Sequence, residues 1–296
     1  GFFDDGKKNL HRVPHVAVYR DFVFVCFDRA NTVALTDYLG NACEVLDVVA
    51  DQGANGMEIT SGGQHYSMRA NWKLLYENSA DGYHAITAHA SYFDYLAASV
   101  GVFRKDFDPT GAGGGGTALG GGHAVIEYQA PWGRPVAQAV PQWGESGARA
   151  VAAVKDELVA RLGAERAARV AEWNRNILIF PNLVINDIMG LTVRTFQPVD
   201  TGYLEVSAWS LAPRGEADEM RSWRQYNFNE FLGPAGFATP DDQEMLELCQ
   251  QGYENMPDVE WNDISKGMNK EKNSGDDEIQ MRAFWLEWDR RMGVEG

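Results

Sequence analysis

The chain has 296 residues, of which 45% are hydrophobic, and a formal net charge of −16. This length suffices for one large domain with an appendage, and the acidic charge argues against nucleic acid as a partner because its phosphates would be repelled. No apolar run approaches the ~20 residues of a membrane helix, and the first residues do not resemble a signal peptide. The three cysteines are scattered and imply no disulfide framework. We therefore expect a soluble, cytoplasmic protein without a membrane partner.

The first part of the chain predicts strands and a short helix. Residues 16–25 form two apolar runs around Arg20-Asp21, a pattern typical of a β-hairpin. A lone hairpin is only marginally stable, so it is an unusual start for an independent domain. Residues 32–50 combine a turn at Gly40-Asn41 with a short helical pattern, and alternation in residues 57–68 predicts strands leading into the next segment.

Residues 71–90 place one acid and two histidines, Asp81, His84 and His89, within nine positions. Neutral imidazole is the commonest protein ligand for Zn, Fe, Cu and Ni. The histidines are five residues apart, roughly 140° around an ideal helix, so the backbone must bend, bulge or end between them if both bind one ion. The alternative is a half-buried helix whose imidazoles bond to backbone. Asp81 favours the metal site, since a metal-bound histidine usually donates its second N–H to a carboxylate.

Residues 108–123 are rich in glycine and end at His123. A glycine run can bind phosphate, but the Gly-Lys-Ser/Thr of a P-loop and the flanking pattern of a Rossmann turn are both missing. We interpret the run as a flexible surface loop, with a lid over the active-site mouth as the alternative. His123 is then a solvated loop residue rather than a third ligand.

The remaining elements predict a sheet covered by helices. Residues 146–175 read as two helices separated at Gly163, with an apolar stripe that needs no chemistry. The predicted strands are 124–128, 177–185, 191–196 and 203–211, and the last three form an antiparallel meander. An aromatic-rich helix over 216–232 covers one face, and an amphipathic helix from residue 279 ends the chain.

Residues 233–250 carry a second candidate for metal binding. The start of a helix would explain these residues without a metal ion. Thr239 would be the N-cap, Pro240 would occupy the first helical position, and Asp241 and Asp242 would lie in the first turn. A helix N-terminus can also orient a ligating carboxylate, so the chemistry alone leaves Asp241 and Asp242 both open.

Taken together, these motifs resemble the catalytic domain of Rieske non-haem iron oxygenases, specifically the α-subunits of ring-hydroxylating dioxygenases of the aromatic-carboxylate (benzoate, p-cumate, terephthalate) branch. The resemblance rests on Asn71-Trp72-Lys73, Glu77-Asn78, Asp81-x2-His84-x4-His89, a Phe-Pro-Asn strand and Gly-Pro-Ala-Gly-Phe before the two acids. It spans essentially the whole chain. It implies that His84, His89 and Asp242, rather than Asp241, bind mononuclear Fe(II). Asp81 then carries electrons from the Rieske cluster of a neighbouring subunit to His84.

The resemblance also implies an α+β fold, a helix-grip (START-like) antiparallel sheet with covering helices. Residues 1–35 would be the C-terminal remnant of a Rieske [2Fe–2S] domain and residues 36–296 the iron catalytic domain. The Cys-x-His and Cys-x2-His pairs that hold such a cluster are missing from this chain, so the cluster would lie in an upstream domain. NAD(P)H would supply electrons through a reductase or ferredoxin. The assembly would be a homotrimer of α-subunits or α3β3 with a small β-subunit.

The implied reaction uses O2 to convert an aromatic substrate, expected to be a carboxylate, into a cis-dihydrodiol. Arg194 is a candidate partner for the substrate carboxylate if its side chain faces the pocket, and an outward-facing surface arginine is the alternative. The other expected pocket residues are Asn78, Phe180, Asn182, Leu232 and Phe237.

Three alternatives remain from the sequence. The first is a monooxygenase or O-demethylase of the same superfamily. The second is a metal-free START-like ligand-binding module. The third is a zinc hydrolase, since tetrahedral zinc accepts the same ligands, although the His-Glu-x-x-His pattern of such enzymes is missing.

Overall fold

The computed structural model describes residues 10–60, 62–99, 113–129, 139–255 and 261–293. Its strands are β1 (His15–Tyr19), β2 (Phe22–Cys26), β3 (Met57–Ile59), β4 (Gln64–Met68), β5 (Gly114–Gly120), β6 (His123–Gln129), β7 (Trp173–Ile179), β8 (Leu183–Asp187), β9 (Leu191–Asp200) and β10 (Tyr203–Pro213). Its helices are α1 (Leu35–Leu39), α2 (Ala42–Ala50), α3 (Trp72–Asn78), α4 (His84–Ala88), α5 (Ala90–Ser99), the short 3-10 helix η2 (Pro141–Trp143), α6 (Gly144–Leu162), α7 (Ala164–Ala171), α8 (Asp218–Glu230), α9 (Ala238–Tyr253) and α10 (Ile279–Met292). In the described ranges, no helix is long and apolar enough to cross a membrane.

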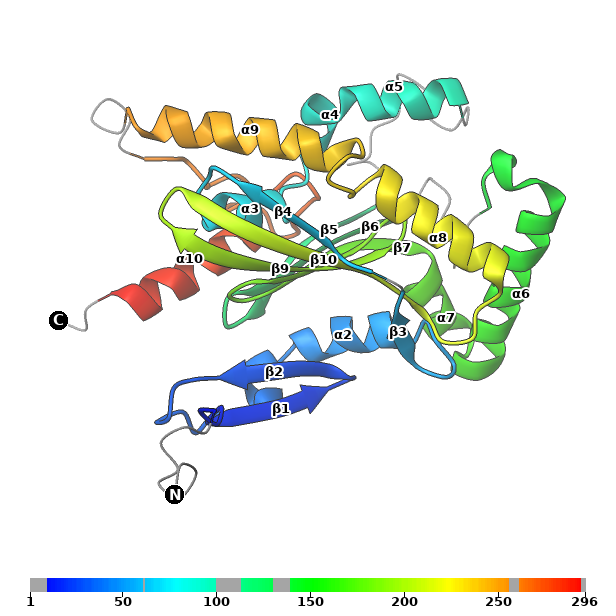
Figure 1. Cartoon of the computed structure of the whole chain (residues 1–296), viewed down its shortest axis with the longest axis horizontal. Helices are drawn as coiled ribbons and strands as arrows, with labels where there is room; N and C mark the ends of the chain where they lie inside the picture. The colour runs from blue at the N-terminus through cyan, green and yellow to red at the C-terminus, as the bar shows by residue number, and fades with distance from the viewer. Residues whose placement is uncertain (1–9, 61, 100–112, 130–138, 256–260, 294–296) are drawn as a thin grey trace, which may run out of the picture.

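An eight-stranded sheet forms the centre of the molecule, in the order β3-β10-β9-β8-β7-β6-β5, with β4 also pairing with β10. All of its pairings are antiparallel. Figure 1 shows α8 and α9 on one side of this sheet and α2 with the β1-β2 hairpin on the other. The predicted α+β class with an antiparallel sheet and covering helices is confirmed.

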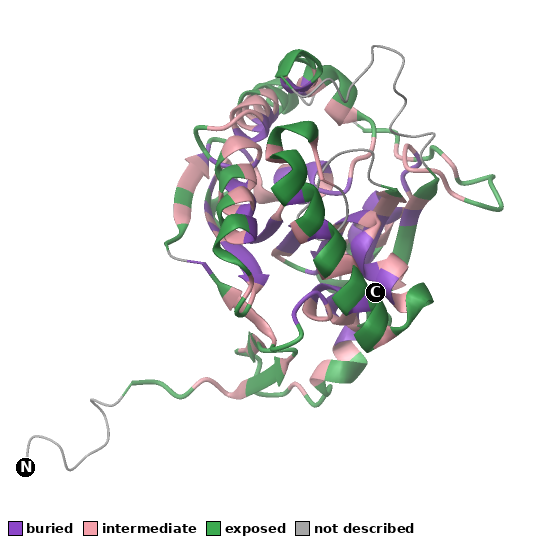
Figure 2. Cartoon of the chain, turned by 90° about the vertical axis from the view of Figure 1, so that its right-hand side faces the viewer, coloured by how far each residue is buried: buried purple, intermediate pink, exposed green. Residues whose placement is uncertain are grey.

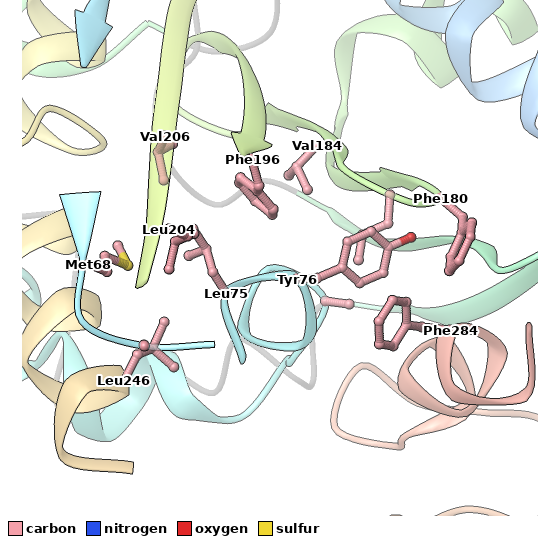
Figure 3. Close-up of a cluster of buried hydrophobic side chains, with 13 residues drawn as sticks. Met68, Leu75, Tyr76, Phe180, Val184, Phe196, Leu204, Val206, Leu246 and Phe284 are labelled. Atoms are coloured by element: carbon pink, nitrogen blue, oxygen red, sulfur yellow. The ribbon is translucent and has the colours of Figure 1, made fainter. Parts of the chain in front are cut away.

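Alternation along the strands assigns side chains to the two faces. On one face, Ile177, Ile185 and Val193 are paired neighbours on adjacent strands and pack against α1, α2 and the hairpin. On the other face, Leu178 and Val184 belong to a second cluster with Tyr76 of α3, Leu246 of α9 and Phe284 of α10. Figure 3 shows Val184, Tyr76, Leu246 and Phe284 of this cluster. The strands therefore supply an apolar layer to both sides of the sheet, which is why their sequences are nearly continuous hydrophobic runs.

The predicted hairpin forms as β1 and β2 and is held to α2 by polar contacts. Arg20 donates to Asp47 at 2.6 Å and to Asp51 at 3.0 Å, and Tyr19 donates its hydroxyl hydrogen to Asp47. The hairpin's other face is apolar and exposed, as the colours in Figure 2 indicate, and carries Val16, Val18, Val23 and Val25.

The interpretation of the glycine run as a flexible loop is wrong for the described part. Residues 114–120 form β5 and pair with β6, whereas residues 108–112 lie outside the described residues. The glycines permit close approach of the C-terminal segment: a Cβ on Gly115 would lie 2.3 Å from the Asn273 carbonyl oxygen, and one on Gly116 would lie 1.9 Å from Gln280 Oε1. The run is glycine-rich because neighbouring chain packs against it.

Three predicted boundaries need correction. Residues 177–185 form two strands, because the chain turns at Phe180–Asn182 between β7 and β8. The second helix of 146–175 ends at Ala171, and β7 begins at Trp173. Thr239 is not an N-cap: α9 begins at Ala238, and the buried Thr239 hydroxyl donates to the Leu232 carbonyl at 2.9 Å. The backbone contact replaces the expected cap.

His123 is a fully buried residue of β6, so its assignment to a solvated loop is wrong. Its Nδ1 accepts from the Phe180 N–H at 3.0 Å, and its Nε2 donates to the Tyr38 carbonyl at 2.9 Å. Burial disfavours the imidazolium and outweighs the contact with the carbonyl, so the pKa of His123 is lowered from 6.5. The neutral ring ties α1 to the β7-β8 turn.

Replacement of His123 by Ala should lower the free energy of unfolding by about 2–4 kcal/mol, because two buried hydrogen bonds and a packed ring are lost. Since the folded pKa lies below the unfolded one, the wild type should lose stability as the pH falls below about 6.5, and this dependence should weaken in His123→Ala. Urea unfolding at several pH values measures both effects. The exposed His65 provides the control, and an equal loss in His65→Ala would contradict the assignment.

Candidate functional site

The backbone between α3 and α4 is held by Asp81. Its Oδ1 accepts from the N–H groups of Tyr83 at 2.7 Å and His84 at 3.1 Å, which orders the start of α4. Gly82 lies against the C-terminal segment, where a Cβ would come within 1.8 Å of the Gly275 carbonyl oxygen. Residue 82 must therefore be glycine for this segment to place His84.

The helix that carries the histidines is interrupted between them, as their spacing requires. His84 is the first residue of α4, while His89 follows its end with φ −102° and ψ 27°, and α5 begins at Ala90. The His89 carbonyl then accepts from the N–H groups of Tyr92 and Phe93. Because the chain changes direction at His89, the centroids of the two imidazole rings lie 5.2 Å apart.

Asp242 completes a group of three potential ligands. One ligand atom from each of His84, His89 and Asp242 can be chosen so that all lie within 4.8 Å of one another. Asp242 Oδ1 lies 3.6 Å from His84 Nε2 and 3.4 Å from His89 Nε2. His89 and Asp242 are buried, at 4% and 5% exposure. The structure thus brings together residues that are more than 150 positions apart.

Each imidazole has a second carboxylate at its other nitrogen. Asp81 Oδ2 lies 3.3 Å from His84 Nδ1, and Asp241 Oδ2 lies 3.3 Å from His89 Nδ1. Burial lowers the pKa of His84, but the contacts with Asp81 and the charge of Asp242 outweigh it, so the net shift is upward. Asp241 and Asp242 therefore occupy different positions: Asp242 faces both Nε2 atoms, and Asp241 faces only the outer side of His89.

The turn before α9 positions Asp242. The chain after α8 folds back so that Phe237 N–H donates to the Glu230 carbonyl and Ala238 N–H to the Phe231 carbonyl. Gly236 permits this turn, since a Cβ would lie 2.4 Å from the Glu230 carbonyl oxygen. Asn78 of α3 donates its side-chain N–H to Asp242 Oδ1 at 3.2 Å. The carboxylate is thus held from two elements.

A cavity adjoins the three residues and is mostly apolar. Its apolar wall comes mainly from α5, the sheet, the segment after β8 and the segment after α8, and includes Tyr92, Phe93, Ile126, Tyr128, Ile188, Met189, Phe231 and Leu232. Its polar residues besides the three are Asn78, Ser79, Asp81, Asn176, Asn186 and Arg194. An apolar pocket with a few polar groups is typical of small-molecule sites.

The expected pocket residues divide into two groups. Asn78, Arg194 and Leu232 line the cavity. The cavity lining does not include Phe180, Asn182 or Phe237. Phe180 packs in the cluster that contains Tyr76 of α3 and Phe284 of α10, Asn182 Nδ2 donates to the Phe196 carbonyl, and Phe237 packs beside Tyr92. Phe180 and Asn182 belong to the turn between β7 and β8 rather than to either strand. They are next to cavity-lining strands in the sequence, but the turn does not place them in the cavity lining.

Sequence reasoning missed Asn176 and Asn186. Both lie on the same sheet face as Arg194, because Asn176 is paired with Asn186 and Arg194 with Val184, two positions before Asn186. The available signal was the polar residues at one end of each otherwise apolar strand, Asn174-Arg175-Asn176 in β7 and Asn186-Asp187 in β8, of which alternation places every second one on the same face. The face on which each polar residue lies can be assigned only when the turn at Phe180–Asn182 fixes the register of β7 against β8.

The donor set fits a divalent transition-metal ion. Two histidines and one carboxylate on one side of an ion leave its other positions open, the arrangement typical of non-haem Fe(II) oxygenases. The carboxylates at both Nδ1 atoms fit as well, because they leave each Nε2 free to bind the metal.

Comparison with known proteins agrees with this geometry. The family described as "Ring hydroxylating alpha subunit (catalytic domain)" matches residues 57–294. The chain is 32% identical over 277 residues to the 2-halobenzoate 1,2-dioxygenase large subunit of Burkholderia cepacia, covering 90% of this chain and 56% of that protein. It is 33% identical over 275 residues to the toluate 1,2-dioxygenase subunit alpha of Pseudomonas putida, covering 89% and 56%. The chain thus spans just over half the length of these relatives.

A solved structure shares the fold. The naphthalene 1,2-dioxygenase of Rhodococcus sp., crystallised with indole, superposes with a TM-score of 0.77 at 22% identity, covering 97% of this chain and 68% of that one. The expected helix-grip architecture is therefore confirmed. From the family match over residues 57–294, we conclude that the chain belongs to the α-subunit family of ring-hydroxylating Rieske oxygenases.

Proposed function

We propose that this chain is the catalytic part of an aromatic-ring-hydroxylating dioxygenase. The observation that carries the proposal is the meeting of His84, His89 and Asp242 beside an apolar cavity. These three residues would hold mononuclear Fe(II), which when bound would supply the activation of O2. The cavity would hold the arene next to the metal while its apolar wall excludes bulk water. The expected product is a cis-dihydrodiol.

The outer carboxylates have distinct roles in this proposal. Asp81 orients His84, fixes which ring nitrogen carries the proton, and forms the bridge for electrons from a neighbouring subunit's Rieske cluster. Its side chain is 15% exposed, so one edge remains accessible to such a partner. Asp241 orients His89 in the same way from α9. Both therefore act through a histidine rather than on the substrate.

An aromatic carboxylate is the proposed substrate class, with Arg194 as its partner. Arg194 is 2% exposed and lies on the cavity face of β9, so the alternative of an outward surface arginine does not describe it. Its Nη2 donates to Ser79 Oγ at 3.2 Å, while its Nε has no hydrogen-bond partner among the described residues. A buried guanidinium with a free donor favours a carboxylate ligand. The relatives named for halobenzoate and toluate support this class.

The remaining parts of the proposal concern domains and partners. Residues 1–35 would belong to a Rieske [2Fe–2S] domain and residues 36–296 to the catalytic domain, and the exposed valines of the β1-β2 hairpin support a further domain packed there. A homotrimer or α3β3 assembly would place that cluster beside Asp81 of the next subunit. Electrons would come from NAD(P)H through a reductase or ferredoxin, in the cytoplasm.

Asp242→Ala should remove bound iron. The wild-type chain, purified without oxygen, should contain about one iron, because three protein ligands suffice to hold it. The variant should contain almost none, while Glu244→Gln, an exposed change in the same helix, should leave the iron content unchanged. Metal analysis of the three proteins measures this. Iron retained by Asp242→Ala, or only zinc in the wild type, would refute the iron site.

Asp241→Asn should weaken metal binding without abolishing it. Loss of the carboxylate beside His89 Nδ1 should raise the dissociation constant roughly 10–100-fold, the usual effect of removing a group that orients a ligand. Titration with Co(II), followed by its visible absorption, gives the constants for the wild type, Asp241→Asn, Asp242→Ala and Glu244→Gln. If Asp241→Asn binds as weakly as Asp242→Ala, Asp241 is a direct ligand.

Arg194→Met should weaken binding of benzoate about 10–100-fold, because a charge-assisted pair is lost. Binding of toluene, which has no carboxylate, should change little, and the iron content should stay the same. Calorimetry on the iron-loaded protein measures both affinities, and Arg194→Lys should recover only part of the loss because ammonium lacks the planar fork. An equal loss for benzoate and toluene would assign Arg194 to packing.

A further inference from the structure

A row of polar side chains crosses the sheet on its cavity face. Asn176 of β7 is paired with Asn186 of β8, which is paired with Thr192 of β9, which is paired with Ser210 of β10. Paired residues share a face, so these side chains project to the same side. Asn176 and Asn186 line the cavity, whereas Thr192 and Ser210 are buried elsewhere on the row. The cavity floor thus carries two adjacent amides.

The two amides are hydrogen-bonded to each other, and the side-chain carbonyl oxygen of Asn186 remains without a partner among the described residues. Asn186 Nδ2 donates to Asn176 Oδ1 at 2.8 Å. Asn186 is 3% exposed, and its Oδ1 has no hydrogen-bond partner among the residues the structure describes. A buried carbonyl oxygen without a donor costs free energy, and native structures rarely leave one unsatisfied. Asn186 therefore lines the cavity and carries an acceptor that no described residue satisfies.

This acceptor lies close to Arg194. Asn186 faces Thr192, and Arg194 is two residues further along β9, so the two are diagonal neighbours, roughly 7–8 Å apart in backbone position. A single benzene ring can therefore meet both groups, with a carboxylate at the guanidinium and another ring substituent at the Asn186 carbonyl oxygen.

We propose that the Asn176-Asn186 pair selects aromatic carboxylates that also carry a hydrogen-bond donor, a hydroxyl or amino group, on the ring. The inference rests on the proposed function and narrows its substrate class. In the proposed complex Asn176 holds the Asn186 amide by accepting from its Nδ2, and Asn186 Oδ1 accepts from the substrate O–H or N–H. A methyl or halogen substituent fills the same space and leaves the oxygen unpaired, which weakens binding.

The test compares substituents of similar size on the same acid. Anaerobic calorimetry on the iron-loaded full chain gives dissociation constants for benzoate and for the 2-, 3- and 4-substituted hydroxy-, amino-, chloro- and methylbenzoates. At one ring position at least, the hydroxy or amino compound should bind roughly tenfold more tightly than its chloro and methyl analogues. Equal affinity at every position, or a preference for chloro or methyl, would overturn the inference.

Variants assign that preference to the amides. Asn186→Leu should abolish the difference between hydroxy and chloro compounds. The double variant Asn176→Leu/Asn186→Leu removes both partners of the internal bond, which guards against a folding defect in the single variant, and should also lack the preference. Thr192→Val, a matched change on the same row outside the cavity, should keep it. A preference that survives in the double variant would overturn the inference, as would its loss in Thr192→Val.

Failure of the inference differs from failure of the proposed function. If benzoate binds and Arg194→Met weakens it, but hydroxyl and chlorine are equivalent, the carboxylate site stands and the amide selection is wrong. If the wild type binds neither iron nor benzoate, the proposed function itself is wrong.

Discussion

The placement of two imidazoles beside one carboxylate is the constraint on which the rest of the site depends. On a continuous helix His84 and His89 would point in directions roughly 140° apart. The helix ends at His89 and a new one begins, which brings both Nε2 atoms within 3.6 Å of Asp242 Oδ1. The break is supported from outside, by Asp81 at the start of α4 and by the approach of Gly275 to Gly82.

The sheet makes the site possible by supplying two different faces. One face is buried against α1, α2 and the hairpin, and it is apolar. The other face is apolar toward α3 and α10, but it carries Asn176, Asn186 and Arg194 where the cavity lies. Burial of these polar groups carries a free-energy cost unless a partner satisfies them. Among the described residues, Asn186 Oδ1 and Arg194 Nε have no hydrogen-bond partner, which supports the proposed ligand site.

Several of the corrections come from packing between segments that are distant in the sequence. The glycines of β5 are needed because the segment before α10 lies against them, and His123 is buried because the β7-β8 turn and α1 close over it. Thr239 contacts the Leu232 carbonyl instead of capping a helix. None of these contacts has a local signature, since glycine, histidine and threonine each have commoner local roles in loops, on surfaces and at caps.

The sequence by itself determined the candidate metal residues, the interruption required between His84 and His89, the antiparallel sheet and the family, because these follow from local spacing, periodicity and short motifs. Only the tertiary structure decided that Asp242 faces both imidazoles while Asp241 faces one, that Arg194 points into the cavity, and that Asn176 and Asn186 meet on its floor. The physical reason is that these positions depend on the register of the strands and on the packing of helices against them. Which side chains face the cavity is set by the turn between β7 and β8 and by the packing of α9 on the sheet, and both depend on contacts between residues far apart in the chain.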